Sequence, residues 1–182
     1  YDMDLSFSES KAAATQNAAS RIDGITETLP CVKDRVDVYG SSDNLRSVTL
    51  LGISDWDALE DYWSLNWEDA PLAPPKPGEA LVSRRLAEKL ELSVGSTVDA
   101  EDSDLKRVSF TVAGIFENYA ANFLFVNDTD CAQGFGSTGP NAMLLETQGD
   151  ENAIAKALTN LDGVTALNRL STALDSVNDA MS

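Results

Sequence analysis

The stretch Gly78–Ala100, "GEALVSRRLAEKLELSVGSTVDA", has the sharpest pattern in the chain. Its first part, "EALVS", predicts a short strand, and Ser83 suits the N-cap of the helix that follows. Val82, Leu86 and Leu90 recur every four residues, which places them on one buried face. "STVDA" then predicts a second strand. The stretch is a strand–helix–strand scaffold, and it holds no residue pattern of a catalytic site.

A long strand follows this scaffold in "RVSFTVAGIFEN", residues 107–118. Its alternating apolar residues share one face, and Gly114 is a candidate bulge. These residues are Val108, Phe110, Val112 and Phe116. On the helix before it, Arg84 and Glu88 are spaced to form a weak i,i+4 ion pair. The middle of the chain is therefore predicted to be mixed α/β.

The two ends of the chain repeat a β-α pattern. "YDMDLSFS" (1–8) alternates as a half-buried strand, and a helix is expected from Lys11 to Leu29, ended by Pro30. Its inward stripe would be Ala14, Ala18, Ile22 and Ile25. Strands at 35–40 and 47–54 follow. Near the end, a strand at 141–147, a helix at 150–161 and a strand at 163–167 precede a last helix at 170–182. The apolar stripe of that helix consists of Leu170, Leu174, Val177 and Met181.

Composition limits the classes of function. The chain has 182 residues, of which 43% are apolar, enough for a stable core without special cross-links. Its 30 acidic and 13 basic residues give a net charge of −17. That charge opposes binding to nucleic acids or to anionic lipids. The longest clean apolar run is Phe123–Val126, so no membrane span is predicted. The missing initial Met favours a domain cut from a longer protein.

Aromatic residues gather in "DWDALEDYWSLNW", residues 55–67, which predicts an amphipathic helix. Two interpretations stay open for this segment: core packing, which the helical spacing favours, and contact with a partner, since Trp and Tyr are frequent at interfaces. The short apolar run at 123–126, expected in a loop, is a second candidate contact. The candidate contact residues are Trp56, Tyr62, Trp63, Trp67, Phe123 and Phe125.

No motif in the chain completes a catalytic or cofactor site. Ser8 to Lys11 fits S-x-x-K and residues 42–44 read "SDN", but the K-T-G element of penicillin-recognising serine enzymes is missing. "GFGSTG" (134–139) matches G-x-G-x-x-G, yet a strand follows it instead of a helix. The acidic runs at 99–104 and 126–130 do not fit a calcium loop and are expected to be solvated turns.

Histidine is absent, so the commonest general base and metal ligand is missing. Cys31 and Cys131 are compatible with either one long-range disulfide or two buried thiols. The sequence therefore predicts no catalytic residue, no cofactor and no metal ligand.

The scaffold motifs resemble the extracytoplasmic domain of FtsX-like ABC transporter permeases, which include the MacB and LolC types. The shared pattern is Gly-Glu before a strand, an S-x-x-L-A-x-x-L helix, a Val-Gly turn, a V-x-G-I strand and an N-x-x-F segment. In this chain it consists of Gly78, Glu79, Ser83, Leu86, Ala87, Leu90, Val94, Gly95, Val112, Gly114, Ile115, Asn122 and Phe125. The chain departs from the pattern at Cys31, where Gly is usual, and at Glu91, where a small residue often closes the helix.

The split β-α pattern of the two ends around a proline-bounded middle predicts an α+β fold with two subdomains, one from 1–53 plus 128–182 and one inserted at 54–127. The resemblance likewise implies a two-part scaffold, with the first subdomain membrane-proximal and the second distal. It implies a non-catalytic domain that relays ATP-driven motion of membrane helices to an external partner or substrate, such as a protein, peptide or lipid. ATP hydrolysis would belong to a separate ATP-binding subunit, and the full-length protein would be dimeric or pseudo-dimeric in the cell membrane. The alternatives are an independent extracellular ligand-binding module and, far behind, a serine hydrolase built on Ser8 and Lys11.

Overall fold

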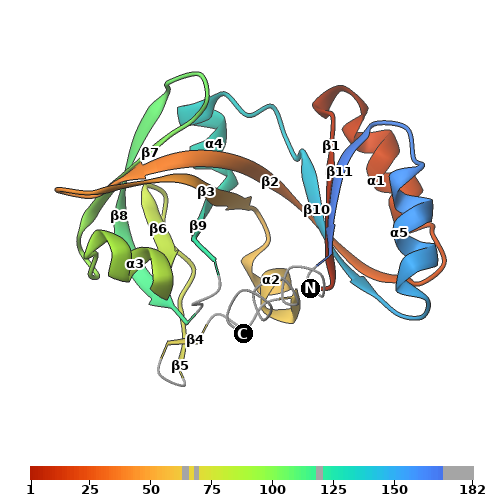
Figure 1. Cartoon of the computed structure of the whole chain (residues 1–182), viewed down its shortest axis with the longest axis horizontal. Coiled ribbons are helices and arrows are strands. Elements are labelled where there is room, and N and C mark those ends of the chain that lie inside the picture. Colours follow the sequence, from red (N-terminus) through yellow and green to blue (C-terminus); the bar gives the residue numbers. More distant parts are fainter. Residues whose placement is uncertain (63–65, 68–69, 118–120, 170–182) are drawn as a thin grey trace, which may run out of the picture. The chain divides into compact units, whose positions relative to one another are not determined.

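The computed structural model describes residues 1–62, 66–67, 70–117 and 121–169 (Figure 1). Contacts between residues divide this part of the chain into two compact units. Unit 1 contains residues 1–31, 61–62 and 139–169, and unit 2 contains residues 32–60, 66–67, 70–117 and 121–138. The last expected helix, at 170–182, lies outside the described residues.

Unit 1 is a split β-α-β arrangement made from both ends of the chain. Its described strands pair in the order β11-β1-β10-β2, and every pair is antiparallel. Helix α1 links β1 to β2, and α5 links β10 to β11, so the pattern is β-α-β-β-α-β with unit 2 inserted in its middle. The bounds are β1 Met3–Phe7, α1 Ala12–Ser20, β2 Ile25–Tyr39, β10 Ala142–Thr147, α5 Glu151–Thr159 and β11 Val164–Arg169.

Both helices of unit 1 cover the same face of its sheet (Figure 1). The core between them comes from alternate strand residues and one stripe of each helix: Met3, Leu5, Phe7, Ala19, Met143, Leu145, Ile154 and Leu158. Asp150 caps α5 by accepting hydrogen bonds from the backbone N–H groups of Asn152 and Ala153. This arrangement confirms the predicted α+β fold with a split β-α unit at the two chain ends.

The first helix is shorter than the sequence pattern predicts. It ends at Ser20 because Gly24 adopts a left-handed φ of +95°, and the β-branched residues after it favour the strand β2. Pro30 lies inside this strand, opposite Met143. The expected inward stripe is wrong at Ala14, which is exposed, whereas Ile22 and Ile25 pack against the core from beyond the end of the helix. The buried residues of α1 are Thr15 and Ala19.

Unit 2 is a closed sheet. Residues 32–39 of β2 pair with β3, and the remaining described strands follow in the order β9, β6, β8 and β7. Strand β7 then returns to β2, where Asp37, Val38 and Tyr39 lie opposite Glu101, Ala100 and Asp99. The bounds are β3 Asn44–Ile53, β6 Glu79–Ser83, β7 Thr97–Glu101, β8 Arg107–Phe116 and β9 Phe123–Asn127. Closure leaves the described strands of this ring without a long open edge.

The scaffold stretch forms the elements that its pattern predicts. Helix α3, Arg84–Leu90, joins β6 to β7, and its residues Leu86, Ala87 and Leu90 are buried in the core of unit 2. The Ser83 hydroxyl makes no cap bond and instead accepts a hydrogen bond from the Phe123 N–H, which fixes β9 against β6. The expected Arg84–Glu88 pair is replaced by an Arg84–Glu117 ion pair of 3.2 Å.

The bulge on the long strand is confirmed. Ala80 pairs with Val112 and the next residue, Leu81, pairs with Gly114, so β8 holds one extra residue between them. Gly114 also permits close packing, because a Cβ there would lie 3.1 Å from a methyl group of Leu81.

The sequence pattern did not reveal helix α4, Asp128–Phe135, which covers the segment expected to be a solvated turn and a loop. It packs tightly on β3, since a Cβ at Gly52 would lie only 2.6 Å from Cys131 Sγ. Strand β3 in turn pairs in parallel with β9. The division between the units therefore falls at 31/32 and 138/139, which differs from the boundaries at 53/54 and 127/128 expected from the sequence.

Two further elements are short. Helix α2, Trp56–Tyr62, begins the aromatic segment. Strands β4, Asn66–Trp67, and β5, Ala70–Pro71, form a two-residue ladder at the start of the proline-rich segment. Among the described residues, no helix combines the length and the apolar character needed to cross a bilayer.

The buried helix face predicts a clear stability effect. Replacing Leu86, which is fully buried in the core of unit 2, by Ala should lower the free energy of unfolding by about 2–5 kcal/mol, because a cavity replaces packed methyl groups. Urea unfolding followed by far-UV circular dichroism measures this change. The neighbouring exposed residue Lys89 provides the control, since Lys89→Ala should change the stability by less than about 0.5 kcal/mol.

Candidate functional site

Two of the aromatic residues predicted to contact a partner, Trp56 and Tyr62, make hydrogen bonds within the fold. The half-buried Trp56 indole donates a hydrogen bond of 2.8 Å to Asn127 Oδ1, and Asn127 Nδ2 donates one of 2.8 Å to the Pro75 carbonyl. Tyr62 is 7% exposed, and its carbonyl accepts a hydrogen bond from the terminal amine of Tyr1. These contacts indicate an architectural role for Trp56 and Tyr62. Trp63 lies outside the described residues, and Trp67 is placed only by its backbone pairing with Ala70.

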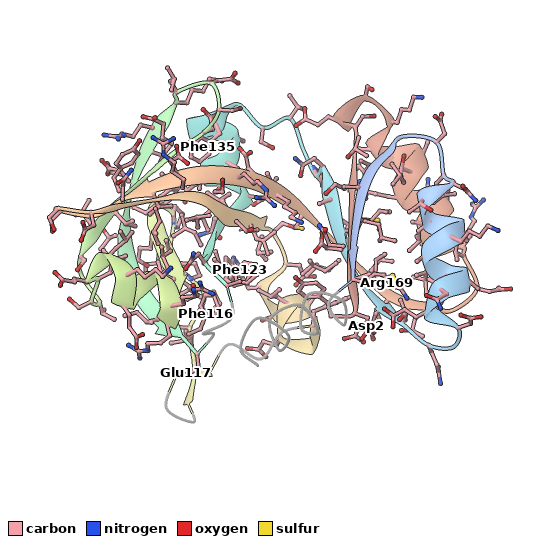
Figure 2. The ribbon with its side chains drawn as sticks, in the orientation of Figure 1. Asp2, Phe116, Glu117, Phe123, Phe135 and Arg169 are labelled. Atoms are coloured by element: carbon pink, nitrogen blue, oxygen red, sulfur yellow. The ribbon has the colours of Figure 1, made fainter. Side chains whose placement is uncertain are left out.

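The second expected contact, residues 123–126, is not a loop. It lies in β9, which pairs with β3 on one side and β6 on the other. Phe125 is fully buried, and its ring centroid lies 5.0 Å from that of Phe116 and 6.2 Å from that of Phe123. Phe123 is half-buried at the start of the strand (Figure 2). Phe125 is therefore a core residue, and Phe123 alone of this pair reaches the surface.

The large apolar side chains that are exposed come from turns instead. Within the described residues these are Val94, 64% exposed between α3 and β7, and Leu105, 76% exposed between β7 and β8. Both turns belong to unit 2. Val94 belongs to the Val-Gly turn of the scaffold motif. Leu105 follows the acidic run, and no hydrophobic pattern in the sequence distinguishes it.

Leu105 is held in an unfavourable backbone conformation. Its φ of +62° lies in the left-handed region, which L-residues with a branched side chain rarely adopt. The turn enforces it: Asp102 Oδ1 accepts hydrogen bonds from the Asp104 and Lys106 N–H groups, and the Leu105 N–H donates to the Asp102 carbonyl. The acidic run is thus a rigid turn, and it presents an apolar side chain to solvent.

The residues weighed for catalysis have structural roles. Lys11 Nζ lies 2.9 Å from both carboxylate oxygens of the exposed Asp162, and this hydrogen bond holds the pKa of Asp162 below its usual value. Ser8 precedes a short 3₁₀ helix, Glu9–Lys11, and its N–H donates to the Gly163 carbonyl. The G-x-G-x-x-G segment begins inside α4 and leads to β10, so no helix begins after it.

Burial disfavours reaction at the two cysteines. Both cysteines are buried thiols. Burial raises the pKa of Cys131 to about 12, with a smaller contribution from Asp130 and Asp128, which keeps this thiol protonated and unreactive near neutral pH. Groups of acidic or sulfur ligands able to hold a metal ion are absent from the described part of the chain.

Comparison with known proteins gives the class of fold. No protein-family model matches the chain, and no curated protein matches its sequence. The structure is similar to the periplasmic region of MacB from Actinobacillus actinomycetemcomitans, with a TM-score of 0.54 and 11% identity over 97% of this chain and 92% of that one. It is also similar to the extracellular domain of the noncanonical ABC-type transporter YknZ from Gram-positive bacteria, with a TM-score of 0.54 and 16% identity over 92% of this chain and 97% of that one.

These likenesses show that the chain has the fold of MacB-like extracytoplasmic domains. The resemblance inferred from the scaffold motifs is therefore confirmed at the level of the fold. The relation extends over nearly the whole of each chain, so it includes both units and is not limited to the strand–helix–strand stretch.

The strained turn at Leu105 predicts an unusual substitution result. Leu105→Gly should raise the free energy of unfolding by up to about 1 kcal/mol, because glycine adopts the left-handed conformation without a Cβ clash. Val94→Gly is the matched control, since Val94 is similarly exposed but has an ordinary φ, and it should lower the stability by about 0.5–1 kcal/mol. Thermal and urea unfolding of both variants measure the difference. A loss of stability in Leu105→Gly would contradict the strain.

Proposed function

We propose that this chain is the extracytoplasmic domain of an ABC transporter permease and that it has no catalytic role. The observation that carries the proposal is the fold similarity, in both directions and over nearly full length, to extracytoplasmic domains of two such transporters. The positions of Ser8, Lys11 and the cysteines support a role without catalysis, because each is used in an ion pair, a turn or the core.

The ends of unit 1 suit a domain that is tethered twice to one surface. Met3, at the start of β1, lies opposite Arg169, at the end of β11 (Figure 2 labels Asp2 and Arg169). Segments before β1 and after β11 therefore leave the same end of this sheet. In our proposal these segments continue into two membrane helices, which makes unit 1 membrane-proximal and unit 2 the distal part.

The proposed role is to relay motion. ATP hydrolysis in a separate ATP-binding subunit would move the membrane helices of a dimeric or pseudo-dimeric permease in the cell membrane, and the domain would pass this movement to an external partner or substrate. The closed sheet of unit 2 supports this role, because a sheet with paired edges and a packed core moves as a rigid body.

The contact surface with the partner is proposed to lie on unit 2. Of the aromatic residues expected there, Trp56 and Phe123 are half-buried. The exposed Leu105, in its rigid turn, is the added candidate that the structure supplies. The hydrogen-bonded backbone of this turn needs little ordering on binding, which favours the use of Leu105 as an anchor.

Labelling from outside the cell tests the localisation. In the full-length protein, Ser103→Cys places a thiol on the exposed acidic turn of unit 2. A membrane-impermeant maleimide should label this variant in intact cells. The unchanged full-length protein is the control for background labelling, to which the buried Cys31 and Cys131 of this domain should contribute nothing. Labelling that requires permeabilised cells would refute the extracytoplasmic position.

Copurification separates the permease from the independent ligand-binding module. The full-length protein should copurify with an ATP-binding subunit, and the association should survive deletion of this domain, because the membrane helices carry it. A full-length protein that never associates with an ATP-binding subunit would favour the ligand-binding module.

A substitution in the undeleted full-length protein tests the relay itself. Leu86→Ala should weaken the coupling between ATP hydrolysis and the external partner more than it lowers the amount of complex, since it loosens the core of unit 2.

A further inference from the structure

Unit 2 contains a surface pocket of about 370 Å³ at the point where its sheet closes. Tyr39 on β2 and Asp99 on β7 lie opposite each other in register and form one wall. The loops after β2 and after α3 form the rest. The lining consists of Tyr39, Gly40, Ser41, Glu91, Leu92, Ser96, Thr97 and Asp99. A volume of this size is in the range of sites that hold a molecule as large as an amino acid.

The loop on one side of the pocket is ordered by backbone hydrogen bonds. The Leu92 N–H donates to the Ala87 carbonyl at 2.8 Å, and its side chain is 9% exposed. The Ser93 N–H donates to Ser96 Oγ at 3.0 Å, and the Ser96 N–H donates back to the Ser93 carbonyl at 2.9 Å. On the other side, Gly40 lies close to α3, because a Cβ there would meet the Leu90 carbonyl at 3.2 Å. The pocket is therefore a fixed feature of the closed sheet.

The lining carries negative charge and hydrogen-bond acceptors. It includes two carboxylates, Glu91 and Asp99, and no basic side chain. The Ser109 hydroxyl donates a hydrogen bond of 2.6 Å to Asp99 Oδ1, which orients that carboxylate and leaves Oδ2 for another donor. The lining also includes the hydroxyl-bearing residues Ser41, Ser96 and Thr97, of which Ser96 already accepts a hydrogen bond from the Ser93 N–H through its Oγ.

The basic group that contacts Tyr39 does not neutralise the pocket. The Arg107 guanidinium carbon lies 3.9 Å from the centroid of the Tyr39 ring, and Arg107 Nε lies 3.3 Å from Glu101 Oε2. Its charge is therefore matched by a carboxylate outside the lining. The contact also shows that the Tyr39 ring accepts a guanidinium group on its face.

We propose that this pocket binds a guanidinium group. Guanidinium is a planar cation with five N–H donors and no acceptor, which complements a lining that has two acidic residues, Glu91 and Asp99, and hydroxyl-bearing residues beside them. The net charge of −17 attracts such cations to the chain. The group is carried either by free arginine or by an arginine side chain of a peptide, and both sources present the same chemistry to the pocket.

The choice of residue at the end of α3 agrees with this assignment. Glu91 follows the helix with φ +53° and ψ +46°, a left-handed position where glycine or asparagine is normally favoured. Glu91 therefore stands where glycine would be less strained, and it belongs to the lining of the pocket.

Calorimetric titration of the full chain tests the proposal. The probes are L-arginine and the end-blocked peptide Gly-Arg-Gly, and the controls are L-citrulline and the corresponding citrulline peptide, which keep the shape but lack the charge. We expect both arginine probes, or the peptide alone, to bind, and the citrulline probes to bind at least about fivefold more weakly. Binding of L-arginine assigns a free ligand, and binding of the peptide alone assigns a protein partner. Absence of binding by both arginine probes, or equal binding of citrulline, would overturn the proposal.

Variants locate the binding within the pocket. Glu91→Gly should weaken binding of the arginine probe at least about fivefold while raising the melting temperature, because glycine suits the left-handed conformation. Asp99→Asn should also weaken binding. Glu88→Gln is the matched control, since it removes an exposed carboxylate from the same helix outside the lining, and it should leave the affinity unchanged. An equal loss of affinity in Glu88→Gln would show attraction by general charge and would refute a specific site.

Discussion

Three residue pairs between β2 and β7 close the sheet of unit 2, and much of that unit depends on them. Without this ladder, β2 and β7 would each have an open edge, and the core side chains Val38, Val98 and Ala100 would be open to water. The same pairing places Tyr39 opposite Asp99, which builds one wall of the surface pocket. Closure of the sheet and formation of the pocket therefore have one structural cause.

Small residues allow the layers around this sheet to approach closely. Gly52 on β3 leaves space for Cys131 of α4, and Gly134 of α4 leaves space for Val108 of β8, where a Cβ would lie 2.4 Å from a methyl group. Helix α4 therefore packs against strands from two parts of the ring. Burial in this helix keeps the Cys131 thiol protonated and unreactive near neutral pH. The close packing of Cys131 on Gly52 is consistent with a rigid unit.

The two units have different relations to the proposed function. Unit 1 joins the start of β1 to the end of β11, so it suits attachment to a surface at two points. Unit 2 carries the turn with Leu105 and the acidic pocket, which are the features that we propose for recognition. In the proposed permease domain the first unit would receive motion and the second would present it to a partner.

The sequence by itself determined the scaffold stretch, the split β-α pattern of the chain ends and the resemblance in fold. These features depend on local periodicity, as at Leu86 and Leu90, or on turn residues with one preferred conformation, as at Gly95. It also located the bulge at Gly114, because a glycine inside an otherwise apolar strand commonly marks a bulge or a close approach of another segment.

Only the tertiary structure decided where the first helix ends, that residues 128–135 form a helix, and where the units divide. Ile154 of α5 packs so closely over Gly24 that a Cβ would lie 2.5 Å from its terminal methyl group, and no local pattern encodes this contact. The polar segment of α4 has a weak helical stripe, and its position depends on packing against β3. The pocket combines Tyr39 and Asp99, which are sixty residues apart and meet only because the sheet closes. Pairing between distant strands depends on the whole core, so the sequence pattern of either strand could not reveal it.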